Sequence, residues 1–306
     1  MNRILSCDWG SSSFRLRLVD TLTKKIHGEV ISDQGIIETH RQWIESGRPS
    51  WERTDFYRAR LTESITHLPV HPDKSIPLIL SGMASSSIGL KELPYNRFPF
   101  RWNLKYWITE KKAGDEILSH PVILVSGFQT NKEIMRGEET KLLGCDIPDE
   151  KEKTLIFPGT HSKHVFVKNK TGQDFKTYMT GELFTLMSEK SVLRHAVEKG
   201  IDGKSFIEGV KAGKDGNILH ELFKVRTRQI LQDYSPVSNY QWLSGLLIGT
   251  ELRELKNPDL PVYLVCGENL RTAYWQGLEV LGFEPVYLNA DEMLTKGHCK
   301  MAEYYL

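Results

Sequence analysis

The feature that most constrains this chain is a glycine turn between two strand-like segments near its start. An apolar run from Ile4 ends at Asp8, and Gly10 is followed by three serines. From Phe14 to Val19, apolar and polar residues alternate with the period of a half-buried strand. The pattern predicts a β-hairpin whose turn lies beside a carboxylate.

The composition of this turn suits phosphate groups. Gly10 lets the backbone approach a ligand closely, and the hydroxyls of Ser11 and Ser12, with successive N–H groups, can donate to phosphate oxygens. Asp8 can hold a hydrated Mg²⁺ ion. An ordinary serine-rich turn capped by Asp8 explains the segment equally well when it is taken alone.

The same device recurs in the middle of the chain. Residues 154–167 read as an apolar strand, a glycine turn and a second strand. The turn contains Gly159, Thr160 and His161, and we interpret the histidine as a phosphate or substrate donor, with a surface turn histidine as the alternative. Two phosphate-sized hairpins, one in each half, indicate two similar domains facing each other across a nucleotide.

A third glycine turn lies near the end of the chain. The buried strand pattern of residues 262–266 reaches Gly267 and continues into a helical pattern. A helix N-terminus is a suitable place for a nucleoside. Together the three turns resemble the phosphate-one, phosphate-two and adenosine motifs of the sugar kinase, hexokinase, Hsp70 and actin superfamily.

This resemblance implies an α/β fold with two ribonuclease-H-like domains, the actin-like ATPase fold, facing each other across a nucleotide cleft. The strand, strand, strand, helix, strand order of the first half agrees with it. We expect domains at 1–150 and 151–306, separated by a solvated charge run at 149–153. The terminal helix, 291–305, is assigned to the second domain, although it could return to the first.

A charged string follows the strand pattern of residues 122–127. Arg136, Glu138 and Glu139 lie close together at a glycine, on or leading into a helix. A kinase acting on an alcohol needs a carboxylate that accepts the hydroxyl proton and donors aimed at the transferring phosphoryl group. A solvated helix face is the ordinary interpretation of such charges and is favoured without other information.

Composition sets the broad class of protein. The chain has 306 residues, enough for two domains, and a formal net charge of +1. This balance gives no reason to expect nucleic acid or an anionic membrane as the main partner, and no apolar run approaches the length of a membrane span. The four cysteines are scattered without CxxC pairing. We therefore expect reduced cysteines in a cytoplasmic enzyme.

Five strings in register sharpen the resemblance to one family. The chain is similar to the 2-dehydro-3-deoxygalactonokinase family at Asp8–Ser11, Met135–Thr140, Pro158–His161, Met179–Leu183 and Leu243–Gly249. The resemblance implies ATP-dependent phosphorylation of 2-dehydro-3-deoxy-D-galactonate at its 6-hydroxyl, in bacterial galactonate catabolism, by a cytoplasmic enzyme using Mg²⁺. The alternatives are a kinase of a related sugar acid or polyol, or an actin or Hsp70-like nucleotide switch.

The resemblance also implies roles for individual residues. Members of the family carry an aspartate shortly before the Met-Arg-Gly-Glu-Glu string, where residues 129–133 of this chain offer only Glu133. The general base therefore stays open among Glu133, Glu138 and Glu139, with Glu138 preferred, and Arg136 would stabilise the phosphoryl group or hold the substrate carboxylate. The nucleotide ligands expected are Asp8 for the metal, Gly10, Ser11, Ser12, Gly159, Thr160 and His161 for phosphates, and Gly267 for the nucleoside. A homodimer is possible.

Overall fold

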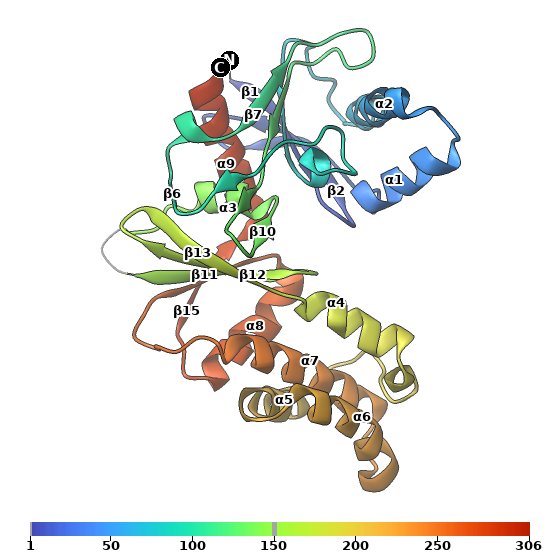
Figure 1. The fold of residues 1–306 in the computed structure, drawn as a ribbon, viewed down its shortest axis with the longest axis vertical. Coiled ribbons are helices and arrows are strands. Elements are labelled where there is room, and N and C mark those ends of the chain that lie inside the picture. Colours follow the sequence, from blue (N-terminus) through green and yellow to red (C-terminus); the bar gives the residue numbers. More distant parts are fainter. Residues whose placement is uncertain (1, 149–151) are drawn as a thin grey trace. The chain divides into compact units, whose positions relative to one another are not determined.

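The protein is described by a computed structural model covering residues 2–148 and 152–306 (Figure 1). The chain forms two compact units. The first unit comprises Met1–Ile147 with Ala290–Leu306, and the second comprises Pro148–Asn289. Residues 290–306 thus belong to the first unit, whereas we assigned the terminal helix to the second domain.

The first unit is built on a mixed sheet with strand order β3-β2-β1-β4-β8-β7. Strands β1, β2 and β3 are antiparallel neighbours, while β4 and β8 continue parallel to β1. This order is the ribonuclease-H-like topology predicted from the sequence. The strands are β1 (Arg3–Trp9), β2 (Phe14–Asp20), β3 (Ile26–Ser32), β4 (Leu78–Gly82), β7 (Thr109–Lys112) and β8 (Val122–Val125).

Helices cover both faces of this sheet (Figure 1). Successive side chains of a strand point to opposite faces. On one face, Trp9 of β1 packs with Tyr57, their ring centroids 5.6 Å apart, in a core that includes Leu61. On the other face, Ser6 reaches His298 of the terminal helix. The helices are α1 (Ile36–Glu45), α2 (Arg53–Thr66), α3 (Glu138–Gly144) and α9 (Ala290–Tyr305).

Helices α3 and α9 cross at glycines, which explains why the terminal helix belongs to the first unit. A Cβ atom on Gly144 would lie 1.8 Å from the carbonyl oxygen of Met293, and one on Gly297 would lie 2.0 Å from that of Thr140. Only glycine permits backbones to approach so closely. Short strands β5 (Asn96–Arg97), β9 (Phe128–Gln129) and β10 (Ile134–Met135) form a small sheet before α3, and β6 covers Phe100–Arg101.

The second unit repeats the same strand topology. Its sheet runs in the order β15-β14-β11-β12-β13, with β11, β12 and β13 antiparallel and β14 and β15 parallel to β11. The duplication expected from the two hairpins is therefore confirmed. The strands are β11 (Lys153–Phe157), β12 (Ser162–Lys168), β13 (Thr171–Tyr178), β14 (Val262–Cys266) and β15 (Pro285–Asn289).

The helices of the second unit pack through small residues. A Cβ atom on Gly209 of α5 would lie 2.2 Å from the carbonyl oxygen of Trp242 in α7, and Gly249 of α7 meets Val210 in the same way. The small residues of α7 thus allow close helix packing. The helices are α4 (Thr180–Thr185), α5 (Gly203–Asp215), α6 (Ile218–Gln232), α7 (Pro236–Leu252) and α8 (Glu268–Val280).

Other predictions have definite outcomes. All four cysteines are free and buried. Residues 149–151 of the expected solvated charge run lie outside the described part of the chain. Lys153, the first residue of β11, is only 4% exposed, so it is not solvated as expected. Within the described residues, no helix combines the length and apolar character that crossing a membrane requires.

Candidate active site

Asp8 lies near the end of β1, close to the backbone of neighbouring segments. Its carboxylate is enclosed by two glycines with left-handed backbone, Gly82 (φ +87°) and Gly137 (φ +105°). A Cβ atom on Gly82 would lie 2.7 Å from the Trp9 carbonyl oxygen and 3.1 Å from Asp8 Oδ1, and one on Gly137 would lie 3.8 Å from Oδ1. Both the backbone angle and the available space thus favour glycine at these positions.

Two cations face the Asp8 carboxylate. Lys141 Nζ lies 3.8 Å and Arg15 Nη1 lies 4.0 Å from Asp8 Oδ2. Both cations lie beyond hydrogen-bond distance of Oδ2, so this oxygen keeps lone pairs that a ligand can use. Burial lowers the pKa of Lys141, but the charges of Asp8 and Glu138 outweigh this effect and hold the pKa above its ordinary value. Lys141 is therefore a firmly charged group of the site.

The place of Lys141 in the site was not predicted from the sequence. The residue lies three positions after Glu138, which places both on one face of helix α3. That spacing was available in the sequence. Its significance depends on Asp8, which lies more than a hundred residues earlier and meets Lys141 only in the fold.

The three carboxylates considered as general base lie in different surroundings. Glu139 is fully buried, and both of its oxygens accept the Gly137 N–H at 2.8 Å. Burial, and next the charge of Glu138, raise the pKa of Glu139 to about 8. Near neutral pH this carboxyl group is largely protonated, and it is committed to the first turn of α3.

Glu138 has an oxygen without a protein partner. The residue is half-buried, and its Oε2 is buried with no hydrogen-bond partner among the described residues. By contrast, Glu133 belongs to a tight turn, where the Thr130 N–H donates to its carbonyl oxygen at 2.9 Å and its own N–H donates to Thr130 Oγ1 at 3.0 Å.

Arg136 is held by contacts within the first unit. Its Nη1 donates to Ser85 Oγ at 2.6 Å and its Nη2 to the Leu93 carbonyl oxygen at 3.0 Å. The guanidinium also lies 3.9 Å from the ring centroid of Tyr95, whereas its Nε is buried without a partner in the described residues. These contacts fix the orientation of the side chain and leave it fewer donors for a ligand than the sequence suggests.

The first glycine turn is closed by its own backbone. The Gly10 N–H donates to the Ser13 carbonyl oxygen at 2.9 Å, so this N–H is occupied, contrary to our expectation of successive free donors. Ser11 is half-buried, Ser12 is exposed, and the Ile36 N–H at the start of α1 binds the Gly10 carbonyl oxygen at 2.9 Å. Helix α1 therefore supports the turn.

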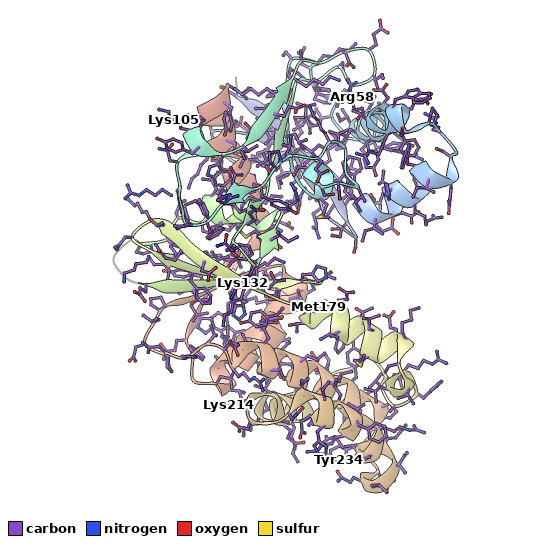
Figure 2. The ribbon with its side chains drawn as sticks, viewed as in Figure 1. Arg58, Lys105, Lys132, Met179, Lys214 and Tyr234 are labelled. Atoms are coloured by element: carbon purple, nitrogen blue, oxygen red, sulfur yellow. The ribbon has the colours of Figure 1, made fainter. Side chains whose placement is uncertain are left out.

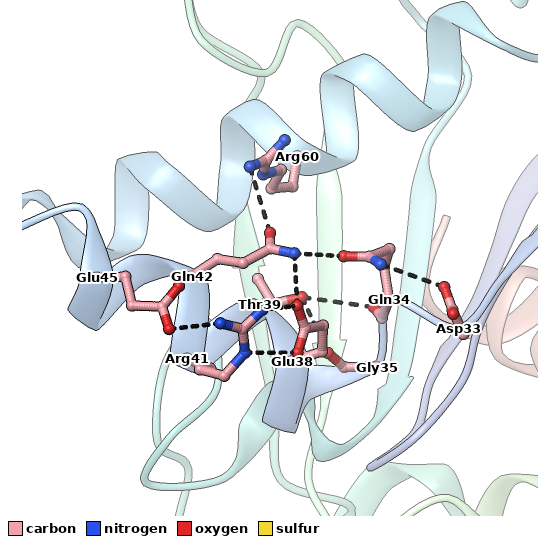
Figure 3. Close-up of polar contacts among 9 residues, drawn as sticks. All are labelled: Asp33, Gln34, Gly35, Glu38, Thr39, Arg41, Gln42, Glu45 and Arg60. Atoms are coloured by element: carbon pink, nitrogen blue, oxygen red, sulfur yellow. Dashed lines mark hydrogen bonds and ion pairs between the residues drawn. The ribbon is translucent and has the colours of Figure 1, made fainter.

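Polar side chains hold helix α1 in place (Figure 3). Gln42 Nε2 donates to Gln34 Oε1 at 2.7 Å and to Glu38 Oε1 at 2.9 Å, while Arg60 of α2 donates to Gln42 at 3.3 Å. The Thr39 hydroxyl binds the Gly35 carbonyl oxygen at 2.9 Å. This network ties α1 to α2 and to the end of β3.

The second glycine turn is open on its outer side. A Cβ atom on Gly159 would meet no atom of the described residues within 4 Å, and Thr160 and His161 are exposed. The His161 Nε2 lies 2.5 Å from Glu182 Oε2, and the Glu182 N–H donates to the Thr160 carbonyl oxygen at 3.0 Å. Glu182 lies in the first turn of α4. Met179, which directly precedes this helix, is 48% exposed (Figure 2).

The third glycine turn has the predicted strand–turn–helix form. Gly267 stands between β14 and α8, directly before the first helical residue, Glu268. The Tyr287 hydroxyl donates to Glu268 Oε1 at 2.7 Å, and the Arg271 guanidinium lies 4.2 Å from the ring centroid of Tyr287. A planar group near this helix start would meet both polar and aromatic surfaces.

Comparisons with known proteins place the chain in one family. The sequence profile of the family described as 2-keto-3-deoxy-galactonokinase matches residues 8–301. The 2-dehydro-3-deoxygalactonokinase of Escherichia coli (strain K12) is 30% identical over 234 residues, covering 74% of this chain and 78% of the relative. A relative from Rhizobium meliloti (strain 1021) that bears the same enzyme name is 29% identical over 305 residues, covering 95% and 93% of the two chains.

A solved structure agrees with these relatives. A crystal structure from Sinorhizobium meliloti, described by the same enzyme name, is 26% identical and has a TM-score of 0.80. The match covers 99% of this chain and 100% of the other. The agreement extends over both units, so this chain is a member of the 2-keto-3-deoxy-galactonokinase family.

Proposed function

We propose that this protein transfers the γ-phosphoryl group of ATP to the 6-hydroxyl of 2-dehydro-3-deoxy-D-galactonate, a step of galactonate catabolism in the cytoplasm. The observation that carries the proposal is the Asp8 carboxylate, enclosed by two glycines and facing Lys141, in a chain of this kinase family. Such a site combines a metal-binding oxygen donor with a fixed cation, as phosphoryl transfer requires.

Glu138 is the general base in this proposal. Its Oε2 has no hydrogen-bond partner in the part of the chain that the structure describes, so it can accept the proton of the attacking hydroxyl. Glu139 is a poorer candidate because its oxygens already bind Gly137 and its pKa is raised to about 8 by burial and by Glu138. Glu133 stays an alternative base, because the bonds of its turn before β10 involve only its backbone.

The residues around Asp8 fit a Mg²⁺ ion that arrives with ATP. Magnesium prefers oxygen ligands and is usually held in such sites by one or two carboxylates, substrate phosphates and water. Asp8 offers that type of ligand, and the described residues contain no cluster of three or more metal-binding side chains. When bound, the ion would neutralise phosphate charge. Asp8 would hold it, and Lys141 would orient the Asp8 carboxylate.

The glycine turns supply the remaining nucleotide contacts. Ser11 and Ser12 in the first unit, and Gly159, Thr160 and His161 in the second, would bind phosphate oxygens. Gly10, whose own N–H is occupied, would only let a phosphate approach the first turn closely, and Gly267 would lie near the nucleoside. The exposed Thr160 and the open space at Gly159 support this assignment. Arg136 would stabilise charge on the phosphoryl group or bind the substrate carboxylate through the donors its protein contacts leave free. The homodimer stays a prediction.

The experiment that tests this function is ADP release by the purified protein with MgATP. The acceptors are 2-dehydro-3-deoxygalactonate, its gluconate epimer and common hexoses, and an Asp8→Asn variant purified in the same way reports contaminating ATPase activity. We expect strong stimulation by the galactonate compound alone. Stimulation by another acceptor would show that the substrate is that acceptor. ATP hydrolysis that does not depend on any acceptor would favour a nucleotide switch.

A further inference from the structure

A buried carboxylate in the second unit has no role in the site described above. Glu251 of helix α7 is 2% exposed, and its two oxygens accept four hydrogen bonds. Oε1 accepts from Ser162 Oγ at 2.6 Å and from His164 Nε2 at 2.9 Å. Oε2 accepts from Thr180 Oγ1 and from the Tyr274 hydroxyl, the latter at 2.7 Å. Each oxygen therefore has two donors.

Three of these donors lie on segments next to the second and third glycine turns. Ser162 opens β12 directly after His161, the last residue of the second glycine turn. Thr180 opens α4, whose backbone supports the same turn through the Glu182 N–H. Tyr274 lies on α8, the helix that begins after Gly267.

Four donors surround Glu251, and an ionised carboxylate can accept from all of them, whereas a protonated carboxyl group or a neutral side chain in its place cannot. Burial raises the pKa of Glu251, but hydrogen bonds from His164, Ser162 and Thr180 outweigh it, so the pKa lies below its ordinary value. The group is therefore an ionised carboxylate, which accepts on all sides. Removal of one hydroxyl partner leaves the remaining donors in place but loosens the segment that carried it.

We propose that Glu251 is a positioning residue for the nucleotide: it fixes the second glycine turn and helix α8, which begins after Gly267, to one another without touching ATP. This inference rests on the proposed function, because it assumes that both turns bind the nucleotide. Because the bonds act on the position of the turns, their loss should weaken ATP binding more than sugar-acid binding.

One matched pair of variants, one further variant and a control test the proposal. Thr180→Val keeps the shape of the side chain but deletes the hydroxyl, whereas Thr180→Ser keeps the hydroxyl. Tyr274→Phe removes the second donor to the same oxygen. The control is Asn239→Ala, which disrupts a buried polar contact from the same helix to the Ala196 carbonyl oxygen, 3.2 Å away, without reaching a nucleotide turn.

The measurements are ADP affinity by calorimetry, KM for ATP and for the sugar acid, and the urea midpoint of unfolding. We expect Thr180→Val and Tyr274→Phe to weaken ADP binding and raise KM for ATP about tenfold, the effect of one lost hydrogen bond to a charged group. Thr180→Ser should bind as the wild type, and KM for the sugar acid should change little.

The proposal is overturned if Thr180→Val and Tyr274→Phe lower the urea midpoint as Asn239→Ala does but bind ADP as tightly as the wild type. The ADP affinity needs no acceptor, so this measurement tests the role of Glu251 separately from the kinase function. A wild type that binds ADP but phosphorylates no sugar acid would refute the kinase function and leave the role of Glu251 supported by the variants. A wild type without nucleotide affinity would refute both.

Discussion

We expect one histidine of the first unit to lower the free energy of unfolding as the pH decreases. His298 of α9 is fully buried and joins two strands, with Nδ1 2.7 Å from Ser6 Oγ and Nε2 3.0 Å from Ser81 Oγ. Ser81 is the register partner of Asp8 on the neighbouring strand. Burial, and then the charges of Arg17 and Lys141, lower the pKa of His298 to about 3.

The sign and size of the effect follow from proton linkage. Between its ordinary pKa of 6.5 and the folded value of about 3, the unfolded chain binds a proton that the folded chain does not. The free energy of unfolding therefore falls as the pH decreases through this range. From about pH 8 to about pH 5, the expected contribution of His298 is a loss of about 2 kcal/mol.

The assay is urea unfolding across this pH range for the wild type and His298→Gln. The amide of glutamine can donate and accept but does not titrate, so the loss on acidification should be about 2 kcal/mol smaller in the variant. Other titrating groups are common to both proteins and cancel in the difference. Equal losses in the two proteins would refute the buried, neutral histidine.

Three further predictions concern the site. Asp8→Asn should lower kcat about a hundredfold or more while leaving the urea midpoint near that of the wild type, and near-normal turnover would exclude a metal role for Asp8. Glu138→Gln should lower kcat by about a hundredfold or more, and Glu139→Gln by less than about tenfold. A larger loss of kcat in Glu139→Gln than in Glu138→Gln would identify Glu139 as the general base. Gly137→Ala should lower the unfolding free energy by about 1 kcal/mol or more because its φ is left-handed, and a urea midpoint equal to that of the wild type would show that this strain is absent.

The sequence predicts the elements whose signals are local. Alternation after Phe14 identifies β2, and the buried runs before Gly159 and Gly267 identify β11 and β14. The ordered repetition of such elements was enough for the two ribonuclease-H-like units. Helix α1 was not predicted, because its residues follow closely on the β3 pattern without a separate local signal.

Residues that act through distant partners could not be predicted in the same way. Glu251 meets Ser162 across 89 positions of sequence, and His298 meets Ser6 across 292. Thr180 opens α4, and its hydroxyl binds Glu251 of α7. Such side chains have no spacing that reveals their partner, so only the fold identifies them.

The most direct test of the central claim is the phosphorus NMR spectrum of the reaction product. MgATP and 2-dehydro-3-deoxygalactonate are incubated with the protein, and coupling of the new phosphomonoester phosphorus to neighbouring protons identifies the esterified carbon. We expect one product whose phosphorus couples to the two C6 protons. A phosphate ester at another carbon, or inorganic phosphate as the only new signal, would contradict it.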